Sequence, residues 1–245
     1  RDFPLARRAA GQALTLAAAF GVAGAALALV LLPAFVRLLA LPEEGTGYAV
    51  EYLTPLAALL PFYMVEVAGI ACLVGAGDTR SGLKVLATVV AVNVPLAYGL
   101  AFGWPGGWGG LGFAGIAWGT GLSHVVGCGL VIAILTRGRF GLRVTGKYLK
   151  PDGSLVYRLL RVSVPAAVDS LSVGVFQFVF LNLVNGLGVT AASAHGIAIR
   201  LEGLGYLSGV AFGTAAVSLV GRALGAGRPD LAARSGWTAF AIGVG

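Results

Sequence analysis

Long runs without a formal charge alternate along this chain with loops rich in arginine and lysine. Ala9–Val36, Val85–Thr136 and Ser170–Ile199 contain no Asp, Glu, Lys or Arg. A helix that crosses the hydrocarbon core of a bilayer needs about 20 mostly apolar residues. Each run can therefore hold a span, and Val85–Thr136 can hold two if it folds back at Gly103–Gly112. The remaining two predicted spans, which bring the total to six, are Tyr48–Val74 and Ala191–Val220.

The charges of the loops predict how these spans are oriented. Fifteen of the 17 lysines and arginines fall on alternate loops: before the first span and after the second, fourth and sixth. The opposite loops carry Glu43, Glu44 and Glu51, or no charge, as around Gly107. Short loops rich in lysine and arginine stay on the cytoplasmic side. We therefore expect a multi-pass protein of the cell (cytoplasmic) membrane with its basic loops in the cytoplasm.

Composition excludes several other classes of protein. A hydrophobic fraction of 58%, a mean hydropathy of +0.89 and a charged fraction of 11% exclude an ordinary soluble domain. The net charge of +7 does not indicate nucleic-acid binding, because no aromatic stacking platform accompanies it. His124 and His195 stand alone without ligand spacing, so we expect no metal site and no organic cofactor. No nucleophile or phosphate-loop motif indicates an enzyme.

The two ends of the chain resemble each other. Leu5–Arg8 and Leu231–Arg234 each lie on a basic loop and each lead into an apolar run. Such a repeated sequence pattern fits a transporter built from repeated helical bundles. We therefore expect residues 1–135 to form the last four helices of one lobe and residues 136–161 to form a basic cytoplasmic linker. Residues 162–245 would then form the first two helices of the next lobe and the start of its third helix. A start at Arg1 and an end inside the apolar run Trp237–Gly245 indicate an internal fragment.

An ionisable side chain within a span is costly and marks a functional candidate. Glu66 lies in the middle of the second span, and Tyr63, three residues earlier, could hydrogen-bond it. Proton relay and neutral packing both remain open for Glu66. Arg200 and Glu202 interrupt the sixth span about 200° apart around the helix, so they should pair with other helices rather than with each other.

Asp169 is the corresponding candidate in the fifth span. We expect Pro165 to open that helix, because proline loses no hydrogen bond in a first turn. Asp169 would then lie about 10 Å from the cytoplasmic end of the helix and share a face with Ser172 and Phe176. It can be a carboxylate that binds the coupling ion, H⁺ or Na⁺, or a protonated acid kept for packing.

Several stretches together resemble the multidrug and toxic compound extrusion (MATE) antiporters. Ala192–Glu202, with its Ala-His-Gly-Ile core, resembles the eighth helix of that family. Gly75–Arg80 is similar to the loop after its fourth helix, Asn93–Leu96 to its fifth helix, and Val164–Ala167 to the start of its seventh. The resemblance runs over essentially the whole chain.

The resemblance implies an all-α membrane protein with two six-helix lobes, of which this chain supplies helices three to eight. It also implies a secondary active transporter, working as a single full-length chain, that exports organic, cationic or amphipathic compounds by alternating access in exchange for Na⁺ or H⁺. Asp169 matches an acid that some members carry four residues after the proline. Val173 stands where many members have glutamate, and Ala97 where the fifth helix often has Asp or Asn.

The sequence therefore predicts two groups of functional residues and leaves two rival functions. The coupling-ion candidates are Asp169 and Glu66. The candidates for a substrate cavity are Tyr63, Asn93, Ser172, Phe176, Gln177, His195, Arg200 and Glu202. A lipid-linked oligosaccharide flippase of the same superfamily would line its cavity with arginine, and a non-transporting receptor or scaffold would not need acids in its spans.

Overall fold

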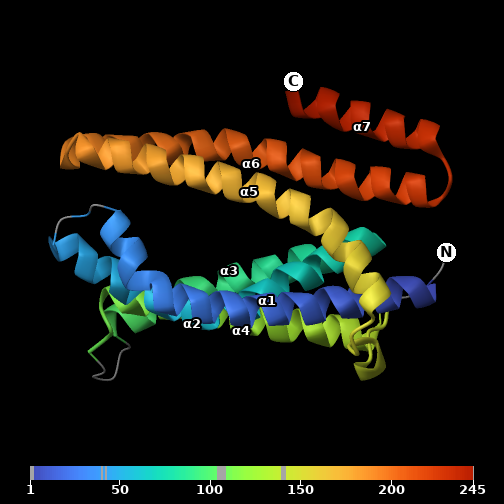
Figure 1. Ribbon diagram of the computed structural model, residues 1–245, viewed down its shortest axis with the longest axis horizontal. Helices are drawn as coiled ribbons and strands as arrows, with labels where there is room; N and C mark the ends of the chain where they lie inside the picture. The colour runs from blue at the N-terminus through green and yellow to red at the C-terminus, as the bar shows by residue number, and fades with distance from the viewer. Residues whose placement is uncertain (1–2, 40, 42, 104–108, 139–141, 245) are drawn as a thin grey trace. The chain divides into compact units, whose positions relative to one another are not determined.

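The computed structural model describes residues 3–39, 41, 43–103, 109–138 and 142–244, and all long elements in these ranges are helices (Figure 1). The elements are α1 (Phe3–Leu38), α2 (Glu43–Ala76), α3 (Thr79–Phe102), α4 (Phe113–Arg137), the 3₁₀ turn η1 (Gly146–Tyr148), α5 (Gly153–Gly186), α6 (Val189–Gly225) and α7 (Pro229–Val244). Within these ranges, α1 to α6 are long and apolar enough to cross a membrane. The predicted six-span, all-α membrane fold is confirmed. Arg1, Gly107 and Gly245, which the predictions above name, lie outside the described residues.

The chain divides into two compact units, Asp2–Phe176 and Gln177–Gly245. In the first unit, α2 packs against α1, α3 and α4, and α4 also packs against α3. Glycines on α4 allow the close approach: a Cβ on Gly119 would lie 2.5 Å from Cα of Ala97, and one on Gly121 would overlap Leu59. Small residues serve this purpose in membranes because close backbone approach maximises van der Waals contact.

The core of this unit lies at the end where its basic loops gather. Leu14 of α1, Leu73 of α2 and Leu135 of α4 are buried together there, and Leu142 and Val144 from the segment after α4 join them. At the start of α2 and α4, the rings of Tyr48 and Tyr52 instead contact Phe113. The basic loops of α1, α2 and α4 thus share one end of the unit, as an alternating topology requires.

The turn between α2 and α3 follows directly from its sequence. Gly77 has a φ of 94°, which favours glycine. Its N–H donates to Val74 O, and the N–H of Asp78 donates to Leu73 O, which is the Schellman pattern that ends a helix. The Asp78 carboxylate then accepts from the N–H of Ser81 and caps α3. Glycine thus ends α2, and Asp78 caps α3.

The expected start of the fifth helix is wrong. α5 begins at Gly153, and Pro165 lies inside it. The cap is Asp152, whose carboxylate accepts from the N–H groups of Ser154 and Leu155. Proline is tolerated inside a membrane helix because neighbouring groups satisfy the freed carbonyl. Asp169 therefore lies about 24 Å along the helix from Gly153, and part of the segment predicted as a linker is helical. The division into lobes stays a prediction.

The second unit contains the end of α5 together with α6 and α7. The α5–α6 turn passes through Gly188, which has a φ of 101°. The ring of Phe180 on α5 meets the ring of His195 on α6 at 5.2 Å between centroids. α6 packs against α7, and the turn between them repeats the Schellman pattern of the α2–α3 turn at Gly227.

Candidate functional site

A carboxyl group and an imidazole meet inside the first unit. Oε2 of Glu66 on α2 lies 2.8 Å from Nδ1 of His124 on α4. Glu66 is 1% exposed, whereas the His124 side chain is 24% exposed. Glu66 precedes the end of α2 at Ala76 by about 15 Å of helix rise, which is near the middle of a hydrocarbon core about 30 Å thick. The pair therefore lies at the depth where an ionisable group is most costly.

The neighbouring helices are shaped to accept this carboxyl group. Gly127 lies three residues after His124, on the same side of α4. A Cβ on Gly127 would lie 2.7 Å from Cδ of Glu66 and 2.5 Å from Cγ2 of Val89 on α3. Only glycine leaves room for both neighbours at this position. The sequence of α4 thus provides both the partner of Glu66 and the space that it occupies.

Tyr63 also adjoins the Glu66–His124 pair, but it contacts the His124 ring instead of forming the expected hydrogen bond to Glu66. Its ring packs edge-on against the His124 ring, with 4.8 Å between centroids. In the structure, the hydrogen-bond partner of Glu66 is His124 rather than the expected Tyr63. Sequence reasoning treated His124 as isolated. Its only signal was a histidine in the long uncharged run Val85–Thr136, which cannot by itself identify a partner 58 residues away.

A second polar pair lies one turn away on α4. Nδ2 of Asn93 on α3 donates to Oγ1 of Thr120 at 3.1 Å, and Thr120 donates to the carbonyl of Ile116 at 3.0 Å. Thr120 and His124 are four residues apart and so share a helix face. The structure thus gives Asn93, a predicted cavity residue, a partner in Thr120 that the sequence did not single out.

This arrangement can exchange a proton. A neutral carboxyl beside a neutral imidazole and a carboxylate beside an imidazolium are both hydrogen-bonded states, so neither leaves an unpaired charge in the membrane. Among the described residues there is no group of three or more His, Cys, Asp or Glu side chains placed to hold a metal ion. A hydrogen-bonded carboxyl group and imidazole can pass a proton between them.

The candidates on α5 and α6 have different surroundings. Asp169, Ser172, Phe176 and Gln177 are exposed on α5, and the Ser172 hydroxyl donates to Val168 O at 2.8 Å. His195 is half-buried on α6 against Phe180. Arg200 and Glu202 are exposed on α6. The roles of these residues stay predictions.

Similarity to known proteins agrees with this fold. A model of the family described as MatE matches residues 1–99 and 165–245. A probable multidrug resistance protein NorM of Thermotoga maritima is 31% identical over 201 residues, which cover 80% of this chain and 43% of that protein. A probable multidrug resistance protein YoeA of Bacillus subtilis is 26% identical over 226 residues, which cover 90% of this chain and 48% of that protein. The chain thus spans about half the length of these curated relatives.

Solved structures show the same fold. The outward-facing conformation of a multidrug resistance MATE family transporter of the MOP superfamily matches with a TM-score of 0.75 and 20% identity, over 97% of this chain and 51% of that one. A MATE crystal structure in the bent conformation also gives a TM-score of 0.75, with 21% identity, over 97% of this chain and 57% of that one. Since the family model covers well over half of the residues, the chain belongs to the MatE family.

Proposed function

We propose that this chain forms part of a multidrug exporter of the cytoplasmic membrane that exchanges organic cations or amphipathic compounds for an inward-moving cation. The proposal is supported by the family and by relatives described as multidrug resistance proteins. Its specific support within the chain is the buried Glu66–His124 pair. The pair contains two titratable groups, so we propose H⁺ as the coupling ion, with Na⁺ as the competing outcome.

The coupling argument depends on differential stability. A bound cation can drive alternating access only if it stabilises one facing state more than the other. A carboxyl group at mid-membrane depth can do this, because exposing it to a water-filled cavity favours the charged form and closing the cavity favours the neutral or paired form. His124 is partly exposed while Glu66 is not, so the histidine provides a route for the proton to the buried acid.

The test is transport by the full-length protein in vesicles with an imposed gradient. Glu66→Gln keeps the shape of the side chain and removes its titration. We expect Glu66→Gln to abolish efflux of a fluorescent organic cation driven by a pH gradient, while equilibrium binding of that cation stays measurable. Glu51→Gln is the matched control, because it makes the same change at an exposed position of the same helix.

Two results distinguish the alternatives. Efflux by wild-type protein that follows an imposed Na⁺ gradient and ignores the pH gradient would replace H⁺ with Na⁺. Normal gradient-driven efflux by Glu66→Gln, with unchanged pH dependence, would exclude the pair as the coupling element.

A further inference from the structure

A cavity of about 330 Å³ lies between the start of α1 and the segment that leads from α4 to α5. It is lined by Pro4, Arg8, Gln12, Lys147, Tyr148, Lys150 and Asp152. Three of these side chains are cationic and one is anionic. All of the lining residues belong to the first compact unit, so the cavity is formed within a single packed body.

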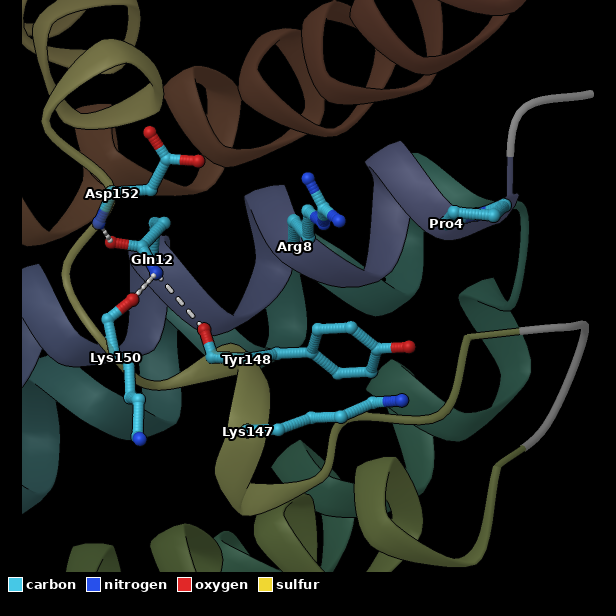
Figure 2. Close-up of a pocket in the computed structure, with 7 residues that line it drawn as sticks. All are labelled: Pro4, Arg8, Gln12, Lys147, Tyr148, Lys150 and Asp152. Atoms are coloured by element: carbon cyan, nitrogen blue, oxygen red, sulfur yellow. Dashed lines mark hydrogen bonds between the residues drawn. The ribbon is translucent and has the colours of Figure 1, made fainter.

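The wall of the cavity is fixed by a buried amide. Nε2 of Gln12 donates to the carbonyls of Tyr148 (2.9 Å) and Lys150 (2.7 Å), and its Oε1 accepts from the N–H of Asp152 (3.0 Å). Gln12 is 2% exposed. Gly11 allows this close approach, because a Cβ there would overlap the carbonyl of Tyr148. The residues 148–152 are thus held on α1 by three hydrogen bonds to one side chain (Figure 2).

The charges in the cavity favour an anion. Lys147 lies 4.9 Å from the centre of the Tyr148 ring, and both side chains extend toward the end of α1 where Pro4 lies (Figure 2). Arg8 lies above the same space. Partial burial acts to raise the pKa of Tyr148, but Lys147 and Arg7 outweigh it and hold that pKa below its usual value. The Tyr148 ring therefore sits in a positive field.

Asp152 offsets only part of this field, because its single negative charge stands against three cationic side chains. It accepts from the hydroxyl and N–H of Ser154 and from the N–H of Leu155, and so caps α5. The Ser154 hydroxyl, followed by the N–H of Leu155, holds the pKa of Asp152 below its usual value. With Arg8, Lys147 and Lys150 against one carboxylate, the lining keeps an excess of positive charge.

We propose that this cavity binds the phosphate group of an anionic phospholipid of the cytoplasmic leaflet. Basic pockets between helices at that surface are suited to anionic headgroups. The uncharged run of α1 begins at Ala9, directly after Arg8 of the cavity lining, and the apolar side chains of Leu5 and Leu149, next in sequence to Pro4 and Lys150, are exposed. This apolar rim favours a lipid over free phosphate. A headgroup held by Arg8 and Lys147 would join α1 to the segment after α4 and stabilise its docked position.

The experiment is native mass spectrometry of the full-length protein with phosphatidylglycerol and, separately, phosphatidylcholine of the same acyl chains. We expect wild-type protein to retain phosphatidylglycerol preferentially. Arg8→Gln/Lys147→Gln should reduce its affinity roughly thirtyfold, given about a fivefold effect for each charge near the surface. The matched control is Arg228→Gln/Arg234→Gln, which removes two exposed arginines from another basic loop and should leave the preference unchanged.

Each further outcome decides the proposal. Arg8→Lys/Lys147→Arg keeps the charges and should retain the lipid even if the glutamine variant does not fold. Equal retention of the two lipids by wild-type protein, or an equal loss in the arginine control, would overturn the proposal. Displacement of the lipid by millimolar glycerol 3-phosphate would assign the cavity to soluble phosphate esters and contradict the choice of a lipid.

Discussion

Oε2 of Glu66 lies 2.8 Å from Nδ1 of His124, which joins α2 to α4. The contact satisfies a carboxyl group that is otherwise enclosed by Gly127 and Val89. It also gives the chain a titratable pair that does not include Asp169.

Removing the imidazole should destabilise the first unit. In His124→Ala the carboxyl of Glu66 would stay buried without its partner, at a cost of about 1–3 kcal/mol. We expect a lower midpoint of thermal unfolding in detergent, with partial recovery in Glu66→Gln/His124→Ala. His195→Ala is the control, because that half-buried imidazole packs on the ring of Phe180 rather than on a buried acid. An unchanged midpoint for His124→Ala would show that the pair contributes no stability.

Close packing of α3 on α4 should be sensitive to a single methyl group. A Cβ on Gly115 would overlap the backbone carbonyl of Leu100, which is part of a helix and cannot turn aside as a side chain would. We expect Gly115→Ala to destabilise the protein by about 1–3 kcal/mol, measured by thermal unfolding. Gly129→Ala, in the same helix but facing open space, should have little effect. Equal effects at the two positions would contradict the packing.

The segment after α4 should become more accessible to protease when the buried Gln12 side chain no longer holds it on α1. Gln12→Leu fills the same space but leaves the carbonyls of Tyr148 and Lys150 without their donor. We expect limited trypsin digestion to cut after Lys147 several times faster than in wild-type protein. Gln177→Leu makes the same change at an exposed position on α5 and should not alter the rate. Cleavage of Gln12→Leu at the wild-type rate would show that the hydrogen bonds of Gln12 do not hold the segment.

Substitution of Asp169 tests whether the second candidate acid couples cation entry to export. Asp169→Asn keeps the side-chain shape and removes the charge at a site that the family pattern associates with the coupling ion. We expect gradient-driven efflux by the full-length protein to fall while binding of the organic cation persists. Asp230→Asn, at the exposed first turn of α7, serves as the control. Normal export by both Asp169→Asn and Glu66→Gln would place coupling wholly outside this chain.

The orientation can be tested by labelling single cysteines after Cys72 and Cys128 are replaced by alanine. An impermeant maleimide applied to intact cells should modify a cysteine at position 43 but not one at position 80, 143 or 228. The reason is that lysine- and arginine-rich loops remain in the cytoplasm. Permeabilisation provides the control, since it should expose all four positions. Labelling of position 143 in intact cells would contradict the topology.

Local patterns predicted much of the fold. The six spans follow from the length and apolarity of the runs, because a backbone in lipid must satisfy its hydrogen bonds within a helix. The α2–α3 turn follows from Gly77 and Asp78, whose conformation and capping depend on neighbours in sequence. The predicted start of α5 was wrong because proline is compatible both with the first turn of a helix and with the interior of a membrane helix, so Pro165 alone does not mark the start. Only the cap at Asp152 decides between the two.

The sequence by itself determined that the chain spans the membrane six times and which of its loops are basic. It also determined that acids such as Glu66 and Asp169 lie within the spans and are therefore functional candidates. Those conclusions depend on composition and on the cost of charge in lipid, both of which are local. Only the tertiary structure decided that His124 is the partner of Glu66, that Thr120 is the partner of Asn93, and that Gln12 holds the segment after α4. Such pairings depend on how helices rotate and align when they pack, and glycines such as Gly127 fix that alignment through contacts that no single segment of sequence contains.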